Sequence, residues 1–167
     1  LCGMYVAGYV KGHKHGMILS HVIASGTYSE ERDGASAALI TAALLHDIGW
    51  TLRRGFPRLG RGLESGHEDI GAELLGRCFN PEVTEPIALH VLAKRHLVAT
   101  EAGYAEKLSS GSVASMERQG LPLTKDESTM FLARDHAEDA LALRRWDEDA
   151  KTSGAATPDL DHFRPMM

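Results

Sequence analysis

The segment at residues 35–48 constrains the fold of this chain more than any other, because most of its side chains are apolar. A helix that is apolar on nearly all sides needs other elements around it, so this segment is predicted to be the central helix of the fold. The apolar run finishes on the adjacent pair His46 and Asp47, and Gly49 is expected to end the helix.

The rest of the chain also favours helices, because alanine and leucine dominate its apolar residues and aromatic residues make up only 6%. A length of 167 residues fits one domain, and no strand-like alternation of any length is present. We therefore predict an all-α helical bundle at residues 17–151, after a flexible lid segment at residues 1–16 and before a loosely ordered tail at residues 152–167. Helices besides the central one are predicted at residues 17–25 and 67–79, from Pro81 or Pro86 to residue 97, and at residues 101–108 and 113–118, with a turn at residues 109–112. One or two more helices follow from Thr124.

The charge of the chain limits its partners. A formal net charge of -5 argues against a general binder of nucleic acid or of anionic membranes. No apolar run approaches the length of a membrane span, so we expect a cytoplasmic protein. An anionic ligand would need a local cationic pocket.

The pair His46 and Asp47 has two interpretations. Adjacent side chains on a helix diverge by about 100°, so the pair could hold a divalent metal ion that lies beside the helix. Alternatively, His46 only interacts with the helix dipole, next to a solvated Asp47.

Further histidines and acids favour the metal. Each lies on or at the end of a different predicted helix, and helical bundles build metal sites from such inward side chains. Nitrogen and carboxylate ligands without thiolates suit iron, manganese, zinc or cobalt. Six groups are more than one tetrahedral site needs, whereas two metal ions that share Asp47 would use them all. For His21 alone, the alternative is a core histidine whose hydrogen bonds are satisfied within the protein. The six candidate metal ligands are His21, His46, Asp47, His67, His90 and Asp147.

Two cations share helix faces with these candidates. His90 and Lys94 are four residues apart, and Arg144 and Asp147 are three apart. A cation turned toward a metal is unfavourable unless an anion such as phosphate or phosphonate lies between them. The alternative is that Lys94 and Arg144 are surface residues paired with acidic neighbours. We expect a small anionic, phosphonate-like substrate as the partner, and neither nucleic acid nor a membrane.

The order of these residues resembles the HD-domain superfamily of all-helical, metal-dependent proteins. Within it, the chain resembles the mixed-valent di-iron oxygenase branch typified by 2-amino-1-hydroxyethylphosphonate dioxygenase. The segments that carry this closer resemblance are LHVLAKRHL at residues 89–97, LSSGSVAS at residues 108–115 and LRRWDEDAK at residues 143–151.

The resemblance implies an Fe(II)/Fe(III) pair that activates O2 and cleaves the C–P bond of a small α-hydroxyphosphonate, with release of phosphate. His46 and Asp47 would be catalytic. One iron would be held by His21, His46, Asp47 and Asp147, and the other by His67 and His90, with Asp47 as the bridge. The phosphonate oxygens would be bound by Lys94, Ser112 and Arg144, with help from Gln119.

The chain departs from the branch at two places. The family usually has a histidine that contacts the phosphonate where this chain has Trp50. The family's lid has a tyrosine and a glutamate; Tyr9 could replace the tyrosine, but residues 11–15 supply no acid to recognise an amine. A related phosphonate or another hydroxylated anion therefore fits as well. The alternatives are a metal-dependent HD phosphohydrolase acting on a phosphate ester, and a non-catalytic HD module that binds a ligand.

Overall fold

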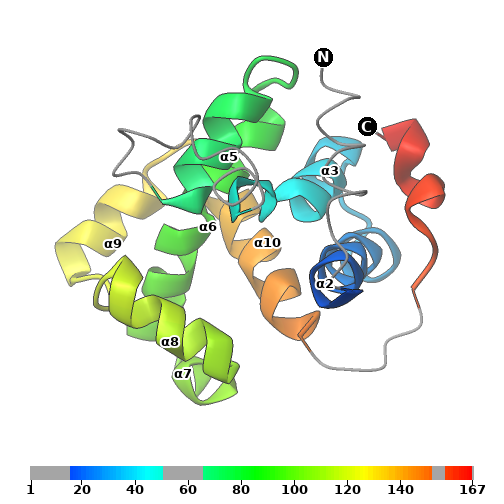
Figure 1. Ribbon diagram of the computed structural model, residues 1–167. Helices are drawn as coiled ribbons and strands as arrows, with labels where there is room; N and C mark the ends of the chain where they lie inside the picture. Colours follow the sequence, from blue (N-terminus) through cyan, green and yellow to red (C-terminus); the bar gives the residue numbers. More distant parts are fainter. Residues whose placement is uncertain (1–15, 51–65, 152–156, 167) are drawn as a thin grey trace.

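The computed structural model describes residues 16–50, 66–151 and 157–166, so the predicted lid lies outside the described residues except for Gly16. Every regular element in this part of the chain is a helix, which confirms the all-α prediction (Figure 1). None of the helices described combines the length and the apolar character that crossing a membrane requires. The elements are α2 (Gly16–Thr27), the π-helix η1 (Tyr28–Arg32), α3 (Ala37–Leu45), α5 (His67–Leu75), α6 (Pro81–Thr100), α7 (Tyr104–Lys107), α8 (Ser110–Gln119), α9 (Lys125–Leu132), α10 (Ala137–Asp149) and the 3-10 helix η2 (Leu160–Met166).

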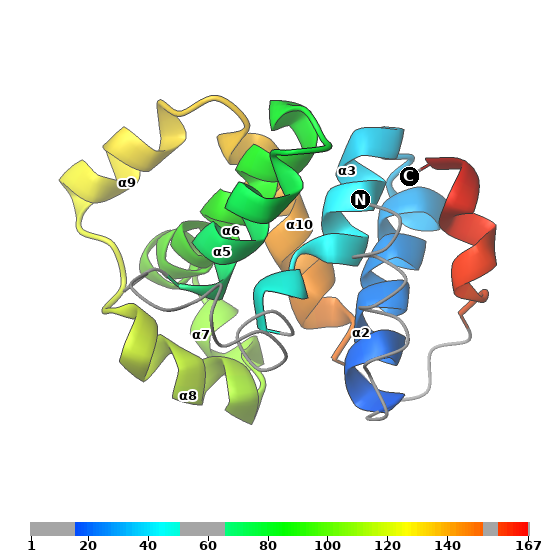
Figure 2. The same cartoon turned by 45° about the horizontal axis from the view of Figure 1, so that its top comes forward.

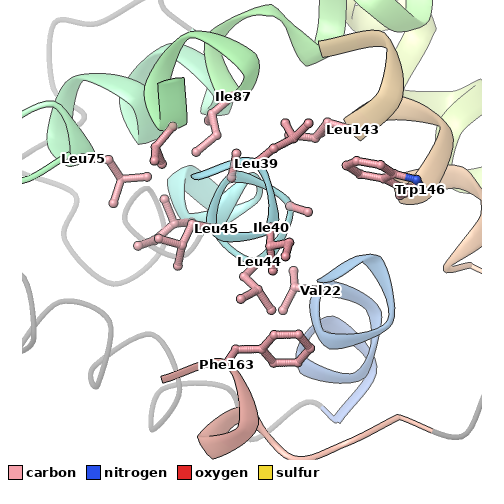
Figure 3. Packing of buried hydrophobic residues seen from close by; sticks show 14 of the residues in the cluster. Val22, Leu39, Ile40, Leu44, Leu45, Leu75, Ile87, Leu143, Trp146 and Phe163 are labelled. Atoms are coloured by element: carbon pink, nitrogen blue, oxygen red, sulfur yellow. The ribbon is translucent and has the colours of Figure 1, made fainter. Parts of the chain in front are cut away.

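Helix α3 is central, as its apolar sequence predicts. Its first turn is capped by Ser36, whose side chain accepts a hydrogen bond from the Leu39 backbone N–H at 3.2 Å. All of its residues from 39 to 45 are buried. Helices α2, α6 and α10 pack around it, and Figure 2 shows α3 next to both α2 and α10. Its buried side chains, among them Leu44 and Leu45, point to several of these neighbours (Figure 3).

The end of α3 differs from the prediction. The helix stops at Leu45, His46 and Asp47 form a turn, and residues 48–50 make a further helical turn. Gly49 is needed for a close approach, because a Cβ on it would lie 1.9 Å from the His67 carbonyl oxygen. The absence of a side chain at Gly49 thus brings the start of α5 against the His46–Asp47 turn.

Helix α6 contributes buried side chains to both hydrophobic clusters of the described residues. It begins at Pro81, which needs no N–H partner at this position. It packs against α3, α5 and α10 (Figure 1). His90 and Lys94, one turn apart on α6, are both buried.

Around residue 110 the prediction of a turn is wrong. Ser109 caps α8 by accepting a hydrogen bond from the Ser112 backbone N–H at 3.2 Å, so Ser110 and Ser112 belong to the first turn of that helix. By contrast, the capping-box pattern at Thr124 is confirmed, because Thr124 and Glu127 cap each other at the start of α9.

Within the predicted tail, the structure describes residues 157–166, which carry η2, whereas residues 152–156 lie outside the described part of the chain. Phe163 on η2 is fully buried, and Figure 3 shows it below α3, near Leu44 and Val22. The Thr41 hydroxyl donates a hydrogen bond to the Met166 carbonyl oxygen at 3.0 Å. Leu160 and Met166 of the same segment also pack against this core, so η2 is attached through several side chains.

Candidate metal centre and anion pocket

The six candidate ligands lie together where α2, α5, α6, α10 and the turn after α3 meet. Asp47 belongs to two groups, and within each group the ligand atoms lie within 4.8 Å of one another. One group adds His21 and His46, and the other adds His67 and His90. Asp147 joins the first group, because its Oδ1 lies 2.8 Å from His21 Nε2 and 3.5 Å from His46 Nε2.

In the first group, the backbone orients the imidazole of His46. Its Nδ1 lies 2.8 Å from the Ala43 carbonyl oxygen, so this nitrogen carries the proton and donates. The other nitrogen, Nε2, faces the cluster; it is buried and makes no hydrogen bond within the described residues. A ring with its proton on Nδ1 has the tautomer and direction that a metal ligand needs.

In the second group, His90 is oriented in the same way, with Nδ1 donating to the Ile87 carbonyl oxygen at 2.7 Å. Its Nε2 lies 3.1 Å from His67 Nε2. Two nitrogens that bind one ion at about 2.1 Å, about 90° apart, are separated by about 3.0 Å. On the far side of the His67 ring, Nδ1 lies 2.9 Å from a Glu68 carboxylate oxygen, the arrangement that orients histidine ligands in metal sites.

The charges of the cluster also suit a cation. Burial by itself would raise the pKa of Asp147, but Arg144 and Lys151 hold that pKa well below its usual range. Burial likewise opposes ionisation of Asp47, whose pKa His46 and His67 keep low. Burial lowers the pKa of His90 to about 3, and the charges of His67 and His46 act in the same direction. The donor set of ionised carboxylates and inward-facing imidazoles fits the metal ions that the sequence predicts.

A cavity of about 460 Å³ opens beside these ligands. Residues of α6, α8 and α10 also line this cavity. All four residues predicted to bind the anion line it, namely Lys94, Ser112, Gln119 and Arg144. The structure therefore brings the predicted metal ligands and anion-binding residues to one place.

Lys94 is not the surface residue of the alternative interpretation. It is 4% exposed, and its ammonium donates hydrogen bonds to the Ser115 hydroxyl at 2.7 Å and to the Gln119 side-chain oxygen. Burial lowers its pKa to about 8, and the charges of Arg144 and Lys151 act in the same direction. A buried ammonium held by neutral groups is suited to an anion that enters the cavity.

The alternative interpretation of Arg144 is a surface residue paired with an acidic neighbour. The pairing is present, since Arg144 contacts Asp147. It is nevertheless buried, with 1% exposure, and its guanidinium also contacts Glu148 and Ser112, the latter at 3.3 Å. Arg144 thus connects a candidate metal ligand to the wall of the anion pocket.

Two residues of this wall have no role in the sequence interpretation. Lys151 lines the cavity. Glu148 lies behind the residues that line the cavity and accepts hydrogen bonds from several of them. The signal that could have identified them is spacing, because Glu148 lies four residues after Arg144 and three before Lys151. Charged residues at a helix end usually face solvent, so the sequence alone does not indicate that these two belong to a pocket.

Trp50 forms an apolar wall next to the second group. Its ring stacks on His67, with the ring centroids 4.6 Å apart and the planes at 20°. Trp50 also lines the cavity, so it lies against both a candidate ligand and the space for substrate.

Comparisons with known proteins agree with this arrangement. The HD domain model matches residues 17–133. The chain is 35% identical over 148 residues to 1-hydroxy-2-(trimethylamino)ethylphosphonate dioxygenase (glycine-betaine-forming) of Leisingera caerulea, a match that covers 88% of this chain and 75% of the relative. It is 42% identical over 131 residues to hydroxymethylphosphonate dioxygenase of Gimesia maris, covering 77% of this chain and 65% of that relative. The chain belongs to the HD domain family, in its oxygenase branch.

Proposed function

We propose that this chain cleaves the C–P bond of a small α-hydroxyphosphonate oxidatively, at a di-iron site, and releases phosphate. The observation that carries the proposal is the shared position of Asp47 between two histidine groups that face a cavity lined by Lys94 and Arg144. Both relatives named above are phosphonate dioxygenases, which supports the same class of reaction.

The iron ions would be divided between the two groups. His21, His46, Asp47 and Asp147 would hold one ion, and His67 and His90 the other, with Asp47 shared. When bound, the pair would supply the redox chemistry that reduces O2. In the overall reaction the α-carbon becomes a carboxylate, phosphorus leaves as phosphate, and both atoms of O2 end in the two products.

The pocket residues would hold the phosphonate. Lys94, Ser112 and Arg144 would donate hydrogen bonds to its oxygens, and Gln119 would keep the Lys94 ammonium in place. A phosphonate bound there would direct its hydroxyl-bearing carbon toward the ligand cluster on the other side of the cavity. Trp50 would cover that carbon with an apolar surface.

The charges of the cavity favour a substrate without an amine. Among the described residues that line it, the charged ones other than the candidate ligands are all cations: Lys94, Arg118, Arg144 and Lys151. An ammonium on the substituent of the substrate would be repelled by this wall. Hydroxymethylphosphonate, on which the Gimesia maris relative acts by its name, is the smallest compound that meets this requirement.

The test measures phosphate release and oxygen consumption together. The iron-loaded protein is given hydroxymethylphosphonate in air and under strict anaerobiosis, and a phosphate monoester such as methyl phosphate in parallel. We expect phosphate and formate from the phosphonate in air alone, with one O2 consumed per phosphate, and no release from the ester. Phosphate release from the ester that continues without oxygen would contradict the proposal and favour hydrolysis.

A further inference from the structure

The carboxylate of Glu148 is the centre of a hydrogen-bond network behind the anion pocket. Its Oε1 accepts from the Ser109 backbone N–H at 2.6 Å. Its Oε2 accepts from the Ser112 hydroxyl at 2.7 Å, from the Lys151 ammonium at 3.0 Å, and from the Arg144 guanidinium. The three side chains that donate to Oε2 all line the cavity.

A buried acid at this place needs an explanation. Glu148 is 8% exposed, and its negative charge would repel an anion in the neighbouring cavity. Arg144 and Lys151, however, have long side chains that lose rotamer freedom when they are held in one geometry. A carboxylate that holds both before the anion arrives reduces the entropy lost on binding.

Lys151 lies where the ligand cluster and the anion pocket meet. Its ammonium is 3.0 Å from Asp147 Oδ1, 3.0 Å from Glu148 Oε2 and 2.9 Å from the Ser112 hydroxyl oxygen. It follows the end of α10 and lines the same cavity as Lys94 on α6. An anion in the cavity is therefore within the field of both ammonium groups.

We propose that Lys151 is a further anion-binding residue of this pocket, and that Glu148 is a positioning residue that holds Ser112, Arg144 and Lys151 ready for the anion. The inference rests on the proposed function in so far as that function places a phosphonate in the cavity. Residues 144–151, at the end of α10, would then have two roles: they would bind the anion and supply the candidate metal ligand Asp147.

The test uses methylphosphonate, which has the phosphonate group but no hydroxyl, and measures its binding to the metal-loaded protein by calorimetry under argon. Glu148→Gln distinguishes two roles of this residue, because they predict opposite changes in the affinity for methylphosphonate. If Glu148 acts only as a nearby negative charge, the substitution tightens anion binding. If it positions the cations, binding weakens by about tenfold, as expected for a lost charge-assisted hydrogen bond.

The matched control is Glu101→Gln. Glu101 accepts a hydrogen bond from Arg145 at 2.6 Å, so it also pairs with an arginine of α10, but neither residue lines the cavity. This variant should bind methylphosphonate as the unaltered protein does. Metal content and melting temperature of each variant show whether the site and the fold are intact.

Lys151 is tested independently with a pair of variants. Lys151→Met keeps the length of the side chain without its charge and should weaken methylphosphonate binding about tenfold, whereas Lys151→Arg should restore most of the affinity. Unchanged or tighter binding in Glu148→Gln, or unchanged binding in Lys151→Met, overturns the inference. If the unaltered protein binds methylphosphonate but oxidises no hydroxyphosphonate, only the proposed function fails.

Discussion

Gly49 and His67 approach so closely that no side chain fits between them. A Cβ on Gly49 would lie 1.9 Å from the His67 carbonyl oxygen. His67 begins α5, and its ring faces Asp47 at 3.3 Å. A small residue at position 49 therefore determines whether α5 can bring its histidine to the shared carboxylate.

Gly49→Ala should push the start of α5 away from the turn. We expect a loss of about 1–3 kcal/mol in the free energy of unfolding, typical of an overpacked site, and weaker retention of one of the two metal ions. Urea denaturation and metal analysis measure the two effects. Gly111→Ala is the control, because nothing lies within 4 Å of a Cβ at that helical position; it should be neutral or slightly stabilising. Equal stability of the two variants would contradict the argument.

Glu68→Ala should weaken the second metal group without removing a ligand. The Glu68 carboxylate lies 2.9 Å from His67 Nδ1, in the place of an outer partner to that ring. Loss of such an outer partner typically lowers metal affinity by about 10–100-fold. A chelator competition experiment gives the affinity, and Asp69→Ala, the neighbouring exposed acid, should leave it unchanged.

Substitution of Asp47 and of Lys94 should separate metal binding from anion binding. Asp47→Ala is expected to lose both metal ions, because this carboxylate belongs to both groups. Lys94→Ala should keep both ions and bind methylphosphonate about 10–100-fold more weakly, since a buried charge-assisted donor is lost. Metal analysis and calorimetry on both variants check this. Retention of two ions by Asp47→Ala would exclude the shared carboxylate.

The affinity for methylphosphonate should decrease at alkaline pH. Burial lowers the pKa of Lys94 to about 8, whereas a bound dianion favours its charged form and raises that pKa. As the pH rises above about 8, the free protein loses the ammonium proton that the complex retains, so affinity falls by up to about tenfold per pH unit. Calorimetry between pH 7 and 10 measures the slope, which should be much smaller in Lys94→Met.

Phe163→Ala should destabilise the whole fold. Phe163 is fully buried against the core around α3 although it lies near the end of the chain. Removal of a buried phenylalanine ring costs about 3–5 kcal/mol. Met130→Ala, a substitution at a residue that is 73% exposed, provides the comparison in urea denaturation and should be close to neutral.

The helices and the grouping of the candidate ligands could be predicted because they depend on periodicity and on residue types that rarely face inward by chance. That His90 and Lys94 share one helix face, and Arg144 and Asp147 another, follows from the geometry of a helix alone. Gly49 was misinterpreted, since glycine after an apolar run usually ends a helix, and its contact with His67 is visible only in three dimensions. Glu148 escaped notice for a similar reason: its four donors come from residues 109, 112, 144 and 151, and only folding brings these together.

Through the contacts of Asp147, we expect metal binding and anion binding to influence each other. His21, His46 and Lys151 approach its Oδ1, and Arg144 approaches its Oδ2. An anion that attracts the two cations leaves more of the carboxylate's charge for a metal ion, so each ligand should raise the affinity of the other. Thermodynamic reciprocity requires the same factor in both directions. A protein depleted of phosphonate would then hold its metal less tightly, and at equilibrium a chelator would remove more metal from the empty enzyme than from the enzyme saturated with substrate analogue.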